Sequence, residues 1–259
     1  MKVWLISAAC AITLGVFAFA PARADNGCAA ALKVFHDADD AFTQADTAKD
    51  KAAWERGNAI VAGHHDDIAP AGCDIDEFEL TRLVALEHGL RTGLSLGTVD
   101  GAEAVRAGDK AYDVTLYNAQ ARRMYMNVRA DLQKRFGSLL LRAHDYLWDT
   151  ARTYRDTVPL SRSDGSCAAP YMDATALVPV TPEFPTNARY IGKVATTLVR
   201  VRLSANGEVD DASIQQSSGN TAIDDAAMQA ARATLYFPKI MNCHRLPGTY
   251  LFRATFSPG

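Results

Sequence analysis

The sequence lacks several features that would identify an enzyme or a nucleic-acid-binding protein. No two cysteines have the Cys-x-x-Cys spacing of zinc and redox sites. Basic residues are not in excess either, since 27 Lys and Arg stand against 30 Asp and Glu, and the formal net charge is −3. No basic stripe is therefore present to neutralise phosphates. We predict a protein that is not an enzyme, with no catalytic residues, metal or cofactor, and no nucleic-acid partner.

The N-terminal segment is the one long apolar run. In residues 1–24, Lys2 precedes an apolar stretch from Val3 to Phe19, and Pro21 to Ala24 place small residues where a signal peptidase reads them. This pattern predicts an exported protein whose signal peptide is cleaved after Ala24, so that the mature form does not span the membrane. The run is about as long as a short membrane span, so an uncleaved inner-membrane anchor is the alternative.

Four cysteines follow the predicted cleavage site: Cys28, Cys73, Cys167 and Cys243. An even number in an exported protein predicts two disulfides. Three pairings are possible, and domain position favours Cys28 with Cys73 and Cys167 with Cys243. The sequence alone leaves the connectivity open.

Residues 25–158 have the apolar spacing of helices. Helices are predicted over about 31–45, 52–62, 76–90, 117–136 and 138–158, with a turn and a short helix within the glycine-rich residues 93–108. Asp74 or Asp76 is expected to cap the third helix, and Gly137 to end the long one before Ser138. The prediction is an all-α bundle of five or six helices.

Residues 159–185 break this pattern. They hold five prolines and the run Ser161-Arg-Ser-Asp-Gly165, and they predict a proline-rich junction between two domains.

The last quarter of the chain predicts a different fold. Two alternating strands flank Asn206-Gly207, which we expect to form a tight type I′ turn with both residues at positive φ. Ser217-Ser218-Gly219 is expected to be a turn leading into a helix over 222–235, which Pro238 ends. Residues 250–256 then alternate as a last strand. The fold class is α plus α+β, in which the helical domain precedes a small two-layer ββαβ domain, residues 186–259, with an antiparallel sheet.

This last quarter resembles a known family, the C-terminal domain of TonB-type proteins of Gram-negative bacteria, over about residues 179–257. The resemblance depends on several short motifs in a fixed order. They are Phe184-Pro185 with Ala188, Asn206-Gly207-Glu-Val, Ser217-Ser218-Gly219, Ile223-Asp224 with Ala226-Ala227, Tyr236-Phe237-Pro238 and the closing strand. Thr197 replaces a common glycine, and Thr234 stands about where the family often has tryptophan.

The resemblance implies a place and a partner. Proteins of this family couple to outer-membrane receptors, and their last strand receives a short extended segment of that partner. The matching positions here are Tyr250, Leu251, Phe252, Arg253, Ala254 and Thr255. We therefore expect a periplasmic docking module that binds an envelope protein by strand addition, although the chain itself or a homodimer mate is an alternative cover for this edge.

Two other functions remain open. An energy transducer anchored in the inner membrane would need an uncleaved first segment and a long spacer, and the junction lacks the Pro-Lys and Pro-Glu repeats of such spacers. An envelope hydrolase would need a site among the histidines of the helical domain. No paired-carboxylate motif accompanies these histidines.

Several polar clusters are candidates for chemical sites. His64-His65-Asp66-Asp67 holds metal-ligating side chains, but adjacent helical residues point about 100° apart and do not converge on one ion without help. His36 with Asp37, Asp39 and Asp40 is similar. Glu87-His88 and His144-Asp145 are candidates for an acid and a base that meet across the bundle. Arg122, Arg123, Arg129, Lys134 and Arg135 predict a solvated basic face, or a site for an anionic envelope component.

Overall fold

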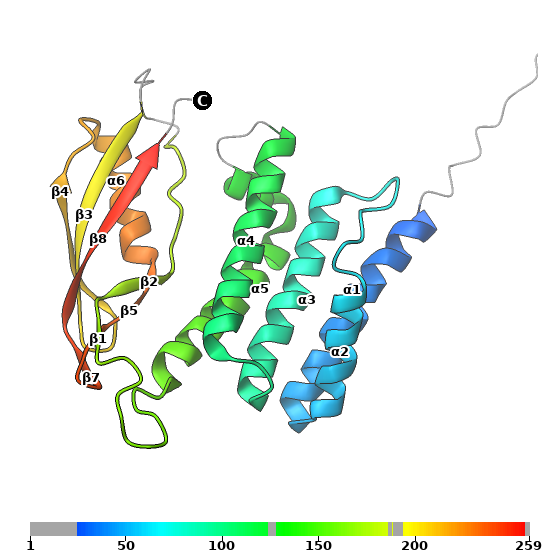
Figure 1. Cartoon of the computed structure of the whole chain (residues 1–259). Coiled ribbons are helices and arrows are strands. Elements are labelled where there is room, and N and C mark those ends of the chain that lie inside the picture. Colours follow the sequence, from blue (N-terminus) through cyan, green and yellow to red (C-terminus); the bar gives the residue numbers. More distant parts are fainter. Residues whose placement is uncertain (1–24, 124–127, 186–187, 189–193, 257–259) are drawn as a thin grey trace, which may run out of the picture.

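A helical domain is followed by a β-rich domain, and the two pack side by side (Figure 1). The computed structural model describes residues 25–123, 128–185, 188 and 194–256. Within these residues five helices precede small antiparallel sheets and a sixth helix. The predicted fold class is therefore confirmed. The signal peptide predicted for residues 1–24 lies outside the described residues.

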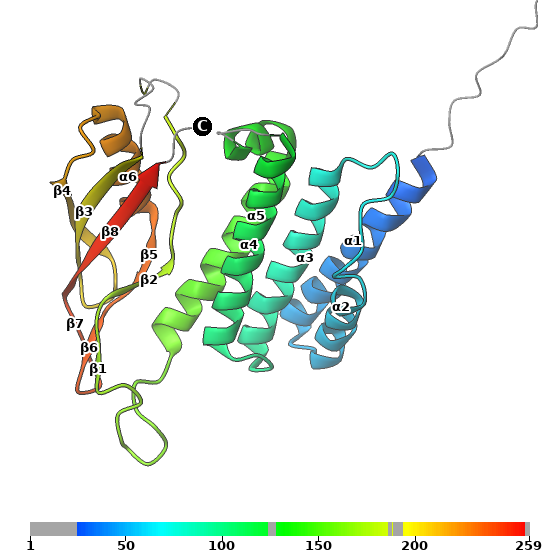
Figure 2. The same cartoon turned by 45° about the horizontal axis from the view of Figure 1, so that its top comes forward.

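In the helical domain, helices that follow one another in the chain run in opposite directions (Figure 1). Its helices are α1 (Asp25–Ala48), α2 (Lys51–Gly63), α3 (Ile75–Leu96), α4 (Gly101–Arg123) and α5 (Val128–Thr157). Helix α1 packs on α2 and α3, and α3 packs on α4 and α5, as both views show (Figure 2). Asp50 and Asp74 cap α2 and α3 with their carboxylates, and Gly97 ends α3 in the left-handed conformation.

Three helix boundaries differ from the prediction. Helix α4 already begins at Gly101, within the stretch expected to form a turn and a short helix. Gly108 lies within this helix and does not mark a turn. The position requires glycine because a Cβ there would lie 2.6 Å from a carboxylate oxygen of Glu87. The helix expected over 117–136 is split between α4 and α5. Gly137 does not end a helix, and α5 is instead kinked at Phe136, where φ is −133°.

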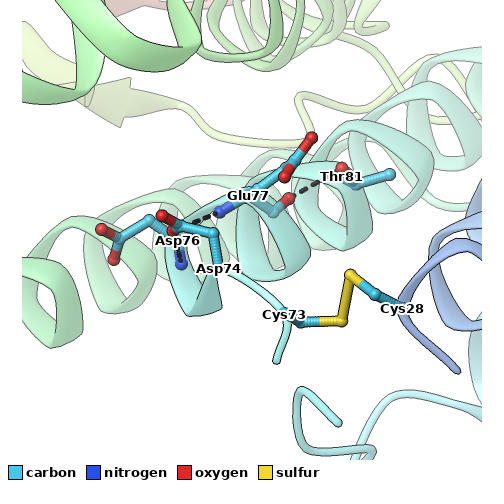
Figure 3. The surroundings of a disulfide bond; sticks show 6 residues. All are labelled: Cys28, Cys73, Asp74, Asp76, Glu77 and Thr81. Carbon is cyan, nitrogen blue, oxygen red and sulfur yellow. Dashed lines mark hydrogen bonds between the residues drawn. A yellow bond between two sulfur atoms is a disulfide. The ribbon is translucent and has the colours of Figure 1, made fainter. Parts of the chain in front are cut away.

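A disulfide ties the first helix to the start of the third. Cys28 of α1 pairs with Cys73, whose Cα lies 5.2 Å away and which directly precedes the cap residue Asp74 (Figure 3). The Asp74 carboxylate accepts from the backbone N–H groups of Asp76 and Glu77. The covalent link and the cap together fix the entry into α3.

The C-terminal domain has two layers. Its main sheet contains β3 (Ala195–Leu203), β4 (Val209–Gln216) and β8 (Gly248–Phe256) in the order β4-β3-β8. Helix α6 (Thr221–Ala233) covers one face of this sheet (Figure 1). Inward-facing strand residues, the apolar side of α6 and the fully buried Tyr236 form the core. Burial of these side chains provides the main driving force for this layer.

The hairpin between β3 and β4 was predicted at the right place but with the wrong turn. Gly207 has φ +79°, whereas Asn206 does not have positive φ. Gly207 N–H donates to Ser204 O, and Ser204 N–H donates to Glu208 O, which gives a turn closed by a glycine bulge instead of a type I′ turn. The Ser204 hydroxyl also accepts from Asn206 N–H and Glu208 N–H, which favours this wider loop.

Helix α6 ends earlier than expected. Its last residue is Ala233, and Thr234 is already extended, so Pro238 is not the terminator. A short strand β5 (Leu235–Phe237) follows directly and pairs with β2 (Thr175–Val178). The burial of Tyr236 and Phe237 accounts for this early end, because a continuing helix would not place both in the core.

The segment expected as a junction contributes to the C-terminal fold. Strand β1 (Tyr171–Met172) pairs with β6 (Lys239–Met241), and β6 pairs with β7 (His244–Leu246). A disulfide joins Cys167 in this segment to Cys243, which lies between β6 and β7. Residues 159–185 are therefore held against the C-terminal domain by both strand pairing and a covalent link.

The two domains share a packed boundary. Val178 of β2 and Leu235 of β5 belong to the same apolar cluster as the cores of α3, α4 and α5. The Tyr154 ring of α5 lies 6.1 Å from the Phe237 ring, and Arg245 donates to the backbone oxygen of Arg155. The sheet β2-β5 thus connects the helical bundle to the main sheet of the C-terminal domain.

Candidate docking edge and interdomain pocket

Strand β8 lies at one edge of the main sheet. It pairs with β3 along its whole length, from Gly248 opposite Leu203 to Phe256 opposite Ala195. Among the described residues, β8 forms no backbone hydrogen bond other than those of this pairing. An edge of this kind presents unpaired N–H and C=O groups.

The hydrogen bonds of the β3–β4 hairpin indicate which β8 residues have unpaired backbone N–H and C=O groups. Ser204 N–H and C=O both bond toward β4, so along β3 the even-numbered residues face β4 and the odd-numbered residues face β8. The register then places Tyr250, Phe252, Ala254 and Phe256 of β8 in hydrogen-bonded pairs with β3. The backbone groups that point away from the sheet are those of the intervening residues Thr249, Leu251, Arg253 and Thr255.

Side chains of β8 alternate between the core and the open face of the sheet. Phe252 is buried, and the ring of the half-buried Tyr250 lies 5.3 Å from that of Tyr236. Leu251 is 46% exposed. Thr255 faces the same side as Thr196, with 3.5 Å between their hydroxyl oxygens. Inward aromatic side chains therefore anchor the strand, while its outer edge carries backbone groups.

The two family positions that differ in this chain both make buried polar contacts. Thr197 donates a hydrogen bond of 2.7 Å to the Asp224 carboxylate. Thr234 donates to Ala230 O and accepts from Val180 N–H at 2.9 Å. Thr234 therefore fixes the point from which the segment after Val180 runs between the sheet and the helices (Figure 1).

Asp224 organises the turn that was expected at Ser217-Ser218-Gly219 before α6. Its carboxylate accepts from the Ser217 hydroxyl, the Thr197 hydroxyl, and the Ser218 N–H and hydroxyl. Burial works to raise the pKa of Asp224, but these hydrogen bonds outweigh burial and lower it. Asn220 then caps the helix.

A pocket of about 450 Å³ lies at the C-terminal end of β8, between the two domains. Thr255 and Phe256 of β8 form one side, and Asp113 and Tyr117 of α4 belong to the opposite side. Residues 181–184 and the start of α5 complete the lining. The volume is within the range of about 300–1,000 Å³ that is typical of ligand pockets.

The pocket has apolar walls with a few charges. Leu116, Phe184 and Phe256 supply apolar surface, and Asp113, Glu183 and Arg129 are its charged residues. One carboxylate oxygen of Glu183, Oε1, is buried and has no hydrogen-bond partner among the described residues. The Arg129 guanidinium lies 5.7 Å from the Tyr112 ring centroid, an ordinary cation–π distance.

Three carboxyl groups of α3 and α4, on the helical side of the interdomain boundary, have raised pKa values. Burial raises the pKa of Asp113, and Arg129 partly offsets it. Burial and the neighbouring Asp113 raise the pKa of Asp109 to about 6. Burial, with a smaller contribution from Asp109, raises the pKa of Glu87 to about 8. Both Glu87 carboxylate oxygens lack a hydrogen-bond partner in the described part of the chain.

The candidate metal clusters do not converge. His64 contacts Asp67 at 2.8 Å, and His65 contacts Ala62 O at 2.9 Å. Over the described ranges, no group of three or more His, Cys, Asp or Glu side chains is arranged to hold a metal ion.

The two candidate histidines each have partners of their own. The His88 ring nitrogen Nδ1 contacts Asp39 at 2.7 Å, and its ring stacks on Tyr146 at 4.4 Å. His144 lies 3.5 Å from its own neighbour Asp145, and burial lowers its pKa. Contacts within the described chain therefore satisfy each histidine separately.

Two residues of the basic face, Arg122 and Arg135, form ion pairs with acids near the start of α3. Arg122 pairs with Asp76 at 2.7 Å and with Glu79 at 2.9 Å. Arg135 pairs with Asp74 and, at 3.2 Å, with Asp76. These ion pairs fasten α4 and α5 to the N-terminal end of α3.

One further pattern, Gly93-Leu-Ser95-Leu-Gly97, has the Gly-x-Ser-x-Gly spacing of a nucleophile elbow and was not among the predicted sites. Such an elbow stands between a strand and a helix. Ser95 instead lies in the last turn of α3, where its hydroxyl accepts from Lys49 at 3.3 Å. Its surroundings do not match those of a nucleophile.

None of the helices in the described part of the chain is long and apolar enough to cross a membrane. The alternative of an inner-membrane anchor concerns residues 1–24, which are outside that part.

Comparison with known proteins identifies the C-terminal domain only. No curated protein and no solved structure matches the chain significantly. One family model does match, and it covers residues 180–258, which include β3, β4, α6 and β8. The resemblance inferred from the short motifs is thereby confirmed: residues 180–258 form a domain of the family described as the Gram-negative bacterial TonB protein C-terminal.

Proposed function

We propose that this protein is a periplasmic docking protein whose C-terminal domain binds an extended segment of an envelope partner by strand addition to β8. The observation that carries the proposal is the outer edge of β8, where Thr249, Leu251, Arg253 and Thr255 direct backbone groups away from β3. Four such residues, two apart, match the repeat of a further antiparallel or parallel strand. The family match over residues 180–258 supports an envelope partner, with an outer-membrane receptor as the first candidate.

Main-chain hydrogen bonds would supply most of the affinity in this mode. The side chains of Phe252 and Tyr250 hold the strand to the core, so the edge is already formed before a partner arrives. Preorganisation of this kind lowers the entropic cost of binding.

A matched pair of variants tests strand addition. Leu251→Pro removes one outward N–H without removing a hydrogen bond to β3, whereas Leu251→Thr changes the side chain and keeps the N–H. A photo-crosslinking residue at the exposed position Thr249 is introduced into both variants and into the otherwise unchanged protein in intact cells.

The expected result is one envelope protein that is crosslinked in the unchanged protein and in Leu251→Thr, and is lost in Leu251→Pro. Thermal unfolding of the purified variants checks that both remain folded. Equal crosslinking in a folded Leu251→Pro variant would exclude docking through this backbone edge.

A further inference from the structure

The interdomain pocket continues the edge of β8. Thr255 directs backbone groups outward, and both Thr255 and Phe256 line the pocket. A segment that follows β8 to its C-terminal end therefore enters the space between the sheet and α4. The inference below depends on the proposed function, because it concerns the same docked segment.

The helical domain forms the far wall of that space. Tyr117 of α4 lines the pocket and is 70% exposed, so its ring is accessible to a bound segment. Asp113, one helical turn earlier, lines it as well. Both side chains lie where the end of a docked strand would pass.

The charges of the pocket favour a cation. Two carboxylates, Asp113 and Glu183, line it with one basic residue, Arg129, which is already placed against the Tyr112 ring. The buried Glu183 Oε1 has no donor in the described structure. A buried carboxylate oxygen without a donor is unfavourable, and a positively charged N–H group is its strongest partner.

We propose that the pocket receives a lysine or arginine side chain at one end of the docked partner segment. Its charged group donates to Glu183 and faces Asp113, while its aliphatic stem packs on Leu116 and Phe184. The helical domain thereby takes part in partner recognition, and the partner is a segment with strand-forming residues and a terminal basic side chain.

Selection from a defined peptide library tests this inference. A display library of random nine-residue peptides, the length of β8, is selected on the purified, disulfide-bonded full mature chain. Selections on Glu183→Gln and on Glu103→Gln run in parallel. Glu103 is an exposed acid near the other end of α4, so its variant is a matched control for the loss of one charge.

The selected peptides are expected to bind through the outward backbone groups of β8. They should therefore bind the Leu251→Thr variant and fail to bind the Leu251→Pro variant. They carry lysine or arginine at one end. Replacing that residue by neutral norleucine is expected to weaken binding about tenfold or more, and Glu183→Gln to remove this difference, while Glu103→Gln keeps it.

Two results would overturn the inference. One of them leaves the proposed strand addition to β8 intact, and the other refutes it as well. Peptides that depend on β8 but show no basic preference, or no effect of Glu183→Gln, would refute the pocket's role and leave strand addition intact. Failure to select any peptide that depends on β8 would refute the proposed function together with the inference.

Discussion

The buried Glu87 makes a strong prediction about stability and pH. Its side chain is fully buried between α3 and α4, its carboxylate lies against Gly108, and neither oxygen has a hydrogen-bond partner among the described residues. Burial raises its pKa from 4.5 to about 8. In the folded protein the group therefore keeps its proton at neutral pH, whereas in the unfolded chain it releases the proton above about pH 4.5.

The direction in which the free energy of unfolding changes with pH follows from the number of protons that each state binds. Between about pH 4.5 and pH 8 the folded state binds more protons at Glu87 than the unfolded state, so the free energy of unfolding falls as pH rises. At about 1.36 kcal/mol for each tenfold change in proton affinity, the full loss is about 5 kcal/mol. About 3.5 kcal/mol of it falls between about pH 5 and pH 8.

The variant Glu87→Gln keeps the shape of the side chain and cannot ionise. We expect its free energy of unfolding, relative to that of the unchanged protein, to increase by about 3 kcal/mol or more from about pH 5 to about pH 8. Urea unfolding followed by tryptophan fluorescence measures this, because Trp54 and Trp148 both lie in the helical domain. Glu103→Gln, which removes an exposed charge from α4, is the control.

The comparison also separates Glu87 from its neighbour. Asp109, with a pKa raised to about 6, adds a pH dependence of its own in both proteins. Because Asp109 also contributes to the raised pKa of Glu87, only the part of its titration that does not depend on the Glu87 charge cancels in the difference. A difference between Glu87→Gln and the unchanged protein that stays constant across this pH range would refute the reasoning.

Three further variants test the contacts that hold the fold together. Gly207→Ala is expected to lower the free energy of unfolding of the C-terminal domain by about 2 kcal/mol or more in urea titrations, because φ is +79° and the new Cβ would lie 2.5 Å from Tyr236 O. Replacing Cys28 and Cys73 together by serine opens a link with a sequence separation of 45, and should lower the stability of the helical domain by about 4 kcal/mol in the chain-entropy model, measured by fluorescence. Asp224→Asn should cost about 1–2 kcal/mol at neutral pH, and this difference should shrink in calorimetry as pH falls through the lowered pKa of Asp224, since the carboxylate stabilises the fold only while it is ionised. Equal melting of any variant and the unchanged protein would contradict the corresponding contact.

Local sequence signals predicted the main elements of the C-terminal domain because they act over a few residues. Alternation marked β3 and β8, and Asn220 and Asp224 stand at the start of α6 as a cap and a first-turn acid do. The turn type failed because Asn206 tolerates positive φ but does not require it, and Ser204 provided competing hydrogen bonds.

Elements that depend on distant partners were missed. Strands β1, β2 and β5 have two to four residues each, and only their pairing with segments far along the chain makes them strands. The glycines of α4 suggested a turn, whereas Gly108 is needed where the carboxylate of Glu87 approaches that helix. No pattern within one segment could indicate the short strands or the place of Gly108 in a helix.

The candidate site, too, could be predicted only in the part that depends on local sequence. The resemblance indicated β8 as the docking strand, but which residues direct backbone groups outward followed only from the hairpin hydrogen bonds and the register. The pocket brings together Asp113 from the helical domain, Glu183 from the expected junction and Thr255 from the last strand. Residues so far apart in the sequence cannot be assigned to one site before the domains are placed.

Amide hydrogen exchange along β8, measured by NMR, tests the central claim most directly. The account predicts an alternating pattern in the free protein, in which the amides of Thr249, Leu251, Arg253 and Thr255 exchange fast and those of Tyr250, Phe252 and Ala254 exchange slowly. Addition of a bound segment should then slow the first set. Slow exchange of that set in the free, monomeric protein would show that the edge is already covered and would contradict docking by strand addition.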